Sequence, residues 1–263
     1  MTDICDPKKL KYPRYPSKAV GTYSSRVVVW PYPREVLEGL LPDRLELAPQ
    51  TITAPDAHPV VMLFGQQTDV KPDFFPFGGM NYFEFIFAIP FVQWKDPNAY
   101  KFRGPFAYMP RLYLDKVMAT LLGYMYGYPK LLARIQGGDT YRVRDLLLDR
   151  PLIRGEFSSK GDAEPVSAFP HFEELRPIFE IPFVGKLDAS PYICSRLTFH
   201  LEDALMRSCT STVELQYEFL TGVFPDTRAS RGLKDEPMGS FDIHVPWELT
   251  LPFGCDCLEC SKG

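Results

Sequence analysis

The sequence has no long hydrophobic run and no excess of basic residues. Its longest stretch without a charged side chain, residues 117–129, contains 13 residues, whereas a helix that spans a bilayer needs about 20. The 29 lysines and arginines are outnumbered by 33 aspartates and glutamates, which gives a formal net charge of −4. This balance lacks the basic surface that attracts nucleic acids and anionic membranes. We therefore expect no membrane insertion and no nucleic-acid partner.

Motifs that bind common cofactors are also missing. The sequence contains no phosphate-binding loop and no dinucleotide fingerprint, and its four histidines are scattered along the chain. The first six residues are polar and acidic, without the basic and apolar segments of a secretory signal. These observations predict a cytoplasmic protein with no cofactor and no metal.

The chain has only six cysteines, and three of them lie close to its end. The motif Cys255-x-Cys257-x-x-Cys260 has a spacing compatible with metal, but zinc usually needs four ligands and a fourth is not close in the sequence. Because nothing indicates secretion, free thiols are the expected state. We expect residues 254–263 to form a flexible tail that contains these cysteines.

Proline and aromatic residues are abundant. The 26 prolines are spread over the whole chain, and aromatic residues make up 14%. Prolines at this spacing favour many short elements, and short strand-like runs dominate the sequence; examples are residues 26–30, 60–64, 212–220 and 247–251. The pattern predicts one β-rich domain over residues 1–263, mainly antiparallel, of the α+β class with a few short helices.

Helical patterns are few. Residues 34–41 lie between two prolines and are long enough for about two turns, and apolar residues in 114–125 follow the three-or-four spacing of an amphipathic helix. Residues 157–182 and 225–237 have no clear periodicity, and we expect irregular surface loops there.

Lys130 is the most unusual ionisable residue. It follows Gly127-Tyr128-Pro129, and no other charged residue occurs between Lys116 and Arg134. A lysine among apolar side chains is desolvated, which lowers its pKa, and the neutral amine can attack a ketone to form a Schiff base. The alternative is a lysine whose stem packs on apolar surface while its ammonium group reaches water.

Glu84 is the second unusual charge, in the apolar run Tyr82-Phe83-Glu84-Phe85-Ile86-Phe87-Ala88-Ile89. Strand alternation places Glu84 on one face with Tyr82 and Ile86, and the phenylalanines on the other face. An isolated carboxylate in such a strand faces water, finds a partner, or has a raised pKa. It is either on a solvent-facing strand or an acid/base group facing a pocket.

Several segments, in the same order along the chain, resemble the acetoacetate decarboxylase family. They are Leu41-Pro-x-x-Leu-Glu-Leu47, Tyr82-x-Glu84 with Ala88-Ile89-Pro90, Tyr113-Leu114-Asp115, Gly127-Tyr128-Pro129-Lys130 and Ser190-Pro-Tyr-Ile-Cys194. The resemblance implies a soluble homo-oligomeric enzyme with a double-barrel-like β fold. It also implies that Lys130 is the Schiff-base lysine and Glu84 the active-site glutamate.

The chain departs from the decarboxylase pattern at several positions. Leu131 stands where a second lysine follows the catalytic one, and a Gly-Arg-Glu stretch before the lysine is missing. An early arginine and another glutamate of the family's pocket have no secure counterparts; Tyr23 and Val61 lie near those positions, and Arg26 is a nearby candidate. The pocket is therefore expected to be more aromatic and less charged, which weakens acetoacetate as the substrate.

The predicted function is a Schiff-base-forming, decarboxylase-like lyase acting on a keto acid or a larger ketone, with Lys130 as nucleophile. Glu84 would move protons, and the substrate would be bound by Tyr82, Tyr126, Tyr128 and Arg26. Two alternatives remain open. One is an aldolase-dehydratase or cyclase of secondary metabolism using the same pocket, and the other is a non-catalytic protein that binds hydrophobic ligands.

Overall fold

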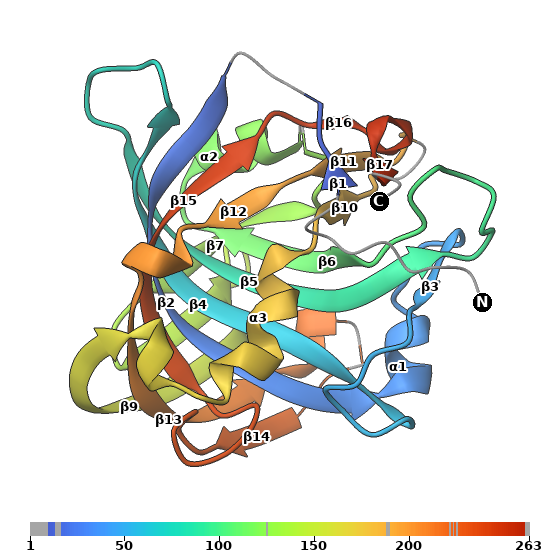
Figure 1. Ribbon diagram of the computed structural model, residues 1–263. Coiled ribbons are helices and arrows are strands. Elements are labelled where there is room, and N and C mark those ends of the chain that lie inside the picture. Colours follow the sequence, from blue (N-terminus) through green and yellow to red (C-terminus); the bar gives the residue numbers. More distant parts are fainter. Residues whose placement is uncertain are drawn as a thin grey trace.

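The computed structural model describes residues 10–13, 17–124, 126–187, 190–220, 222, 224 and 226–260. It confirms a strand-rich fold with few helices (Figure 1). The helices are α1 (Arg34–Glu38), α2 (Val117–Tyr124) and α3 (Phe172–Glu180). The strands are β1 (Leu10–Lys11), β2 (Lys18–Pro33), β3 (Leu45–Leu47), β4 (Ala57–Pro72), β5 (Met80–Trp94), β6 (Phe106–Leu114), β7 (Lys130–Gln136), β8 (Thr140–Asp145), β9 (Pro151–Pro165), β10 (Phe183–Gly185), β11 (Ile193–Ser195), β12 (Leu197–Phe199), β13 (Leu205–Leu215), β14 (Asp226–Ser230), β15 (Phe241–Thr250), β16 (Phe253–Gly254) and β17 (Glu259–Cys260).

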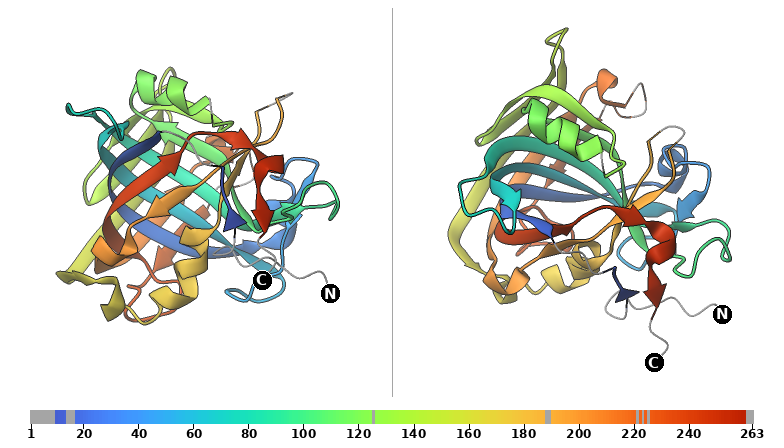
Figure 2. Two further views of the ribbon diagram at one scale, coloured as in Figure 1. Left: turned by 45° about the horizontal axis from the view of Figure 1, so that its top comes forward. Right: turned by 90° about the horizontal axis from the view of Figure 1, so that it is seen from above.

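Most strands belong to one large sheet that closes on itself. Its order includes β6-β7-β8-β9-β13-β15-β2-β4-β5, and β5 also pairs with β6, which completes a ring. The sheet continues past β6 through β10, β11 and β16, while β12 pairs with β15. Most pairings are antiparallel, and β6 pairs in parallel with β7 and β10. Helix α3 contacts β12 and lies in front of β4 and β5 in the view of Figure 1, and Figure 2 gives two further views.

The long strands β2, β4 and β5 form a wall between two hydrophobic cores. In β4, Met62 and Phe64 belong to the core inside the closed ring, whereas Val61 and Leu63 belong to a second core that includes α3. Both faces of a strand in this wall are buried, which explains its nearly continuous apolar sequence. Two cores on a shared wall agree with the expected double-barrel-like fold.

Three local predictions were wrong. The alternating run 212–220 is a strand only as far as Leu215, and Tyr217–Leu220 is a 3-10 helix. Residues 157–182 are not a loop: they contain the end of β9 and all of α3, whose buried Phe172, Leu175, Ile178 and Phe179 follow helical spacing. Pro177 lies inside α3 and obscured this pattern, since proline normally ends a helix. Residues 225–237 contain β14.

The cysteines near the end of the chain also differ from expectation. Cys194 and Cys255 form a disulfide with Cα atoms 5.0 Å apart, so free thiols were the wrong prediction for this pair. Cys255 therefore has no thiolate to offer a metal. Strand β17 pairs with β1, so residues 254–260 pack on the fold, in contrast to the flexible tail expected there; residues 261–263 and Cys5 lie outside the described residues.

No helix in the described part of the chain is long and apolar enough to cross a bilayer.

Candidate active site

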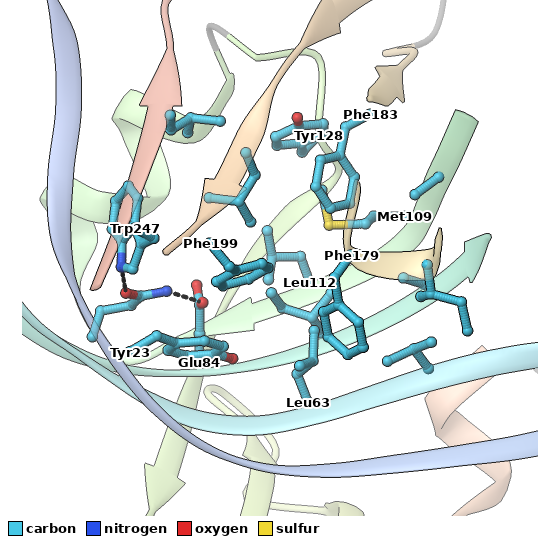
Figure 3. Close-up of a pocket in the computed structure, with 18 of the residues that line it drawn as sticks. Tyr23, Leu63, Glu84, Met109, Leu112, Tyr128, Phe179, Phe183, Phe199 and Trp247 are labelled. Carbon is cyan, nitrogen blue, oxygen red and sulfur yellow. Dashed lines mark hydrogen bonds between the residues drawn. The ribbon is translucent and has the colours of Figure 1, made fainter. Parts of the chain in front are cut away.

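A cavity of about 100 Å³ lies within the second core. Its walls come from β2, β4, β5, β6, β12, β15 and α3, together with Tyr128, Lys130 and Phe183. Figure 3 shows Glu84 and Trp247 on one side of the cavity and Phe179, Phe183 and Met109 on the other. The cavity therefore has one polar end and an apolar remainder.

The register of the sheet explains how Lys130 and Glu84 reach the same cavity. Lys130 on β7 pairs with Leu112 on β6, and Leu112 pairs with Ile86 on β5. Glu84 is two residues from Ile86 on β5, and residues two apart project from the same face of a strand. The expected alternation is confirmed: Tyr82 and Ile86 lie in the second core, whereas Phe85 lies in the first.

The turn before Lys130 depends on glycine. Gly127 has φ +68°, a left-handed conformation that glycine adopts at little cost. Its backbone also packs against Gly185 of β10, where a Cβ would lie 2.4 Å from the carbonyl oxygen of Tyr126. These two glycines hold the Tyr128-Pro129-Lys130 segment close to the sheet, which fixes where β7 begins.

A third glycine makes room for the lysine itself. Gly123 lies in the last turn of α2, and a Cβ there would be 1.8 Å from Cδ and 2.5 Å from Nζ of Lys130. The Lys130 side chain therefore passes directly over the helix where the side chain is missing. This explains a glycine inside a helix, where it normally costs about 1 kcal/mol relative to alanine.

Lys130 is held in an apolar environment without a direct partner. Neither a hydrogen bond nor an ion pair within 4 Å joins its Nζ to any described residue, Glu84 included. Burial lowers the pKa of Lys130 below its usual value, and the nearby Glu84 charge opposes this shift. Burial thus favours the neutral amine, the form that acts as a nucleophile.

Glu84 is buried, with 4% of its surface exposed, which rules out the solvent-facing alternative. Burial raises its pKa, while the Lys130 charge and a hydrogen bond from Gln67 oppose the rise. Desolvation thus moves the two pKa values toward each other, the lysine downward and the glutamate upward. Pairs with such shifts in one cavity are typical of acid/base sites.

A hydrogen-bond chain orients Glu84. Trp247 Nε1 donates to Gln67 Oε1 at 2.6 Å, and Gln67 Nε2 donates to Glu84 Oε1 at 2.7 Å (Figure 3). An indole N–H can only donate, so the Gln67 amide must present its oxygen to Trp247 and its NH₂ group to Glu84. The chain fixes one carboxylate oxygen as an acceptor, and the Tyr23 side chain also acts on the carboxylate and lowers its pKa.

The tyrosines differ in position. Tyr82 and Tyr128 line the cavity. The Tyr128 hydroxyl is hydrogen-bonded to Ser195, and burial raises the pKa of both tyrosines. Tyr126 is not part of the cavity wall; its ring stacks on Tyr128 with centroids 5.9 Å apart. Tyr126 is thus placed to support Tyr128 rather than to contact a ligand directly.

Arg26 does not line this cavity. It contacts Asp139 at 3.1 Å and Asp242 at 3.8 Å, in a separate polar depression on the other face of β2. By contrast, Tyr23 and Val61 are both in the wall of the cavity. Leu131 is more than a third exposed and points away from the cavity, so a lysine at this position would not face a bound ligand.

Sequence reasoning missed Gln67, Trp247 and Gly123. The first two are joined across 180 residues, and neither stands out locally. Gly123 carried a signal, because it is a glycine inside the predicted helix. Its contact with Lys130, seven residues later, becomes clear only when the helix is seen packed on β7.

Replacement of Glu84 by glutamine is expected to shift the reactivity of Lys130 to lower pH. The carboxylate charge raises the pKa of Lys130, so its removal leaves only the lowering by burial. The neutral amine then appears at lower pH. The measurement is the pH dependence of Lys130 acylation by an activated ester, quantified by peptide mass spectrometry. A profile that stays in place or moves upward in the Glu84→Gln variant would show that Glu84 does not act on the lysine.

Comparisons with known proteins agree with the fold. The enduracididine biosynthesis enzyme MppR, solved with pyruvate, has a TM-score of 0.59 at 12% identity, covering 90% of this chain and 89% of that chain. An acetoacetate decarboxylase-like enzyme from Sphingomonas wittichii RW1 has a TM-score of 0.58 at 13% identity, and the match covers 90% of this chain and 93% of that chain. Acetoacetate decarboxylase from Legionella pneumophila has a TM-score of 0.54 at 17% identity, and the match covers 93% of this chain and 88% of that chain.

No curated protein matches the sequence. The model of the acetoacetate decarboxylase family matches residues 7–221, most of the chain. The chain is a decarboxylase-like enzyme that belongs to the acetoacetate decarboxylase family.

Proposed function

We propose that the protein is a lyase that forms a Schiff base between Lys130 and the carbonyl carbon of a keto acid or ketone. The observation that carries the proposal is the half-buried, unpaired lysine in one cavity with a buried glutamate. Family membership and the match of Gly127-Tyr128-Pro129-Lys130 to the family's lysine turn support it.

In the proposed reaction the neutral amine of Lys130 adds to the substrate carbonyl. Glu84 gives a proton to the hydroxyl of the adduct, water leaves, and a protonated imine forms. If a carboxylate lies on the next carbon, the bond to it breaks, carbon dioxide leaves, and the electron pair moves to the imine nitrogen as an enamine. Glu84 takes up a proton from solvent after its first transfer and gives it to the enamine carbon, which restores the protonated imine. Water then adds to the imine, Glu84 accepts the proton released from that water, and the adduct breaks down to the ketone product and the neutral amine of Lys130.

The geometry of Glu84 suits both proton transfers. Its carboxyl group has a raised pKa because it is buried, which keeps a proton available at higher pH. Gln67 holds one oxygen in place, and Tyr23 in the same wall also acts on the carboxylate. Tyr82 and Tyr128 line the same cavity, and in the proposed reaction they would orient a carbonyl or hydroxyl group of the substrate.

The same imine also permits an aldol addition or a dehydration. MppR, whose fold is similar, has been solved with the condensation product of pyruvate and imidazole 4-carboxaldehyde. Tyr23 and Val61, which lie near positions where the family's pocket has charged residues, both line the cavity, and their lack of charge favours keeping this second candidate for the present chain.

The experiment is a panel of β-keto acids and ketone–aldehyde pairs incubated with the purified protein. Release of carbon dioxide with a matching ketone product is the expected result. Condensation products without carbon dioxide would instead support the aldolase-dehydratase function. Unchanged substrates, together with ordinary reversible binding, would contradict both and leave a ligand-binding protein.

We further propose that the protein is a homo-oligomer. Helix α2 exposes large apolar side chains: Val117, Met118, Leu121, Leu122 and Tyr124 are each between 45% and 57% exposed. A contiguous apolar face of this kind is typical of an interface between subunits. A second copy of the chain would cover α2, which also lies against Lys130.

Replacement of Leu121 by lysine is expected to convert the assembly to monomers, because a charged side chain would be buried in the interface. Light scattering after size-exclusion chromatography measures the mass. The control is Thr227→Lys, since Thr227 is exposed on β14 and far from α2 (Figure 1). An unchanged mass for Leu121→Lys, or a monomeric native protein, would show that α2 is not the interface.

A cytoplasmic location stays a prediction, and the Cys194–Cys255 disulfide opposes it. Disulfides persist in oxidising compartments and are rare in the cytosol.

A further inference from the structure

Beyond its polar end, the cavity is built from hydrocarbon. From Glu84 the wall continues along β5 through Ile86 and Ala88 to Pro90. Ala88 is four residues from Glu84, which is about 13 Å along a strand. Ala107 and Met109 of β6 also line this part of the cavity. The strands therefore lead away from the two ionisable groups along an apolar arm.

Ile178 and Phe179 of α3 and Phe183 of β10 also line the cavity. Figure 3 shows Phe179, Phe183 and Met109 grouped together, on the side away from Glu84 and Trp247. Phe179 also packs on Phe199 of β12 with ring centroids 5.9 Å apart. Aromatic rings held in this way give the arm a fixed shape.

The described lining of the apolar arm contains no charged side chain that could pair with a charged group on the substrate. In the described part of the cavity wall, Lys130 is the one cationic residue, and Glu84 is the one carboxylate. Tyr23 and Val61 in the same wall are uncharged, since burial raises the pKa of the Tyr23 hydroxyl. A carboxylate in the arm would be desolvated without an ion pair, which is strongly unfavourable.

We propose that the substrate carries an uncharged hydrocarbon tail that occupies this apolar arm while its carbonyl group reaches Lys130. The inference rests on the proposed Schiff-base function and narrows its substrate class. A cavity of about 150 Å³ with a lining of this kind holds a benzene molecule; this one has about 100 Å³. In proportion, the cavity has room for about four carbon atoms, so the tail is short. A carboxylate that is lost as carbon dioxide lies next to the carbonyl, at the Lys130 end.

The test is the rate at which borohydride traps simple ketones on Lys130. The series acetone, 2-butanone, 2-pentanone and 2-hexanone lengthens an uncharged tail by one methylene at a time. Each buried methylene is expected to raise trapping at low ketone concentration roughly threefold to fourfold. Levulinate and 5-methyl-2-hexanone form a matched pair, since they have similar shape and differ in the charge of the tail; levulinate is expected to react at least about tenfold more slowly.

The variant Ala107→Leu narrows the arm and is expected to abolish the dependence on tail length while acetone is still trapped. The control Ala229→Leu makes the same change at an exposed position of β14, outside the cavity wall, and is expected to retain that dependence. Equal trapping of acetone, 2-hexanone and levulinate by the native protein would overturn the apolar-tail inference and leave the Schiff-base function standing. No adduct on Lys130 with any ketone would overturn the proposed function itself.

Discussion

Replacement of Lys130 by alanine is expected to abolish imine formation and to lower turnover by at least about 1,000-fold. A nucleophile that forms a covalent intermediate cannot be replaced by binding energy alone, and losses of this size or larger follow its removal in other enzymes. Lys130 is also the one cation in the described cavity wall, so no neighbouring amine can take over. The measurement is the initial rate with the best substrate of the panel.

Two controls make this result interpretable. Lys116→Ala removes an exposed lysine just before α2 and is expected to leave the rate unchanged. The thermal unfolding midpoint of Lys130→Ala should stay close to that of the native protein, because a half-buried lysine without an ion pair contributes little to stability. Native-like turnover in a folded Lys130→Ala protein would mean that the reaction proceeds without an imine.

Gly123→Ala is expected to inactivate the enzyme while leaving the fold intact. The new Cβ would lie 1.8 Å from Cδ of Lys130, so the lysine side chain must leave its present path. Displacement of a reacting group by about 1 Å can cost on the order of 100-fold in rate. At the same time alanine is a better helix former than glycine by about 1 kcal/mol, so α2 itself is not weakened. The measurement combines the rate of borohydride trapping with the unfolding midpoint.

The matched control is Gly39→Ala, at the end of α1. A Cβ there would find its nearest atom at 3.5 Å, and the residue has helical φ and ψ angles. This variant should trap ketones at the native rate. If Gly123→Ala also retained the native trapping rate, the close passage of Lys130 over α2 would have no functional meaning.

Much of the fold followed from local patterns. Alternation along 82–89 correctly separated Glu84 from the phenylalanines, because the two faces of β5 line two different cores. Alternation gave the wrong prediction for residues 212–220. The strand ends at Leu215, and the same alternating pattern also fits the 3-10 helix that follows, in which Phe219 packs in the first core. Helix α3 was missed because Pro177 interrupts its pattern.

The sequence predicted the two ionisable residues of the candidate site, but not the residues that contact them. Lys130 and Glu84 stood out because each is a charge in an apolar run. Arg26 was misplaced, although its separation of three residues from Tyr23 already puts the two on opposite faces of a strand. Gln67 and Trp247 depend on a contact between distant strands, as does the Cys194–Cys255 disulfide. Such contacts have no local signature in one sequence.

The most direct test of the central claim is to locate the adduct formed when the native protein is reduced with borohydride in the presence of 2-hexanone. Digestion and mass spectrometry identify the modified residue. We expect one reduced adduct, on Lys130. The adduct should be absent from the Lys130→Ala variant, in which Glu84 and the rest of the cavity are unchanged. An adduct on exposed lysines alone, or no adduct on the folded protein, would contradict it.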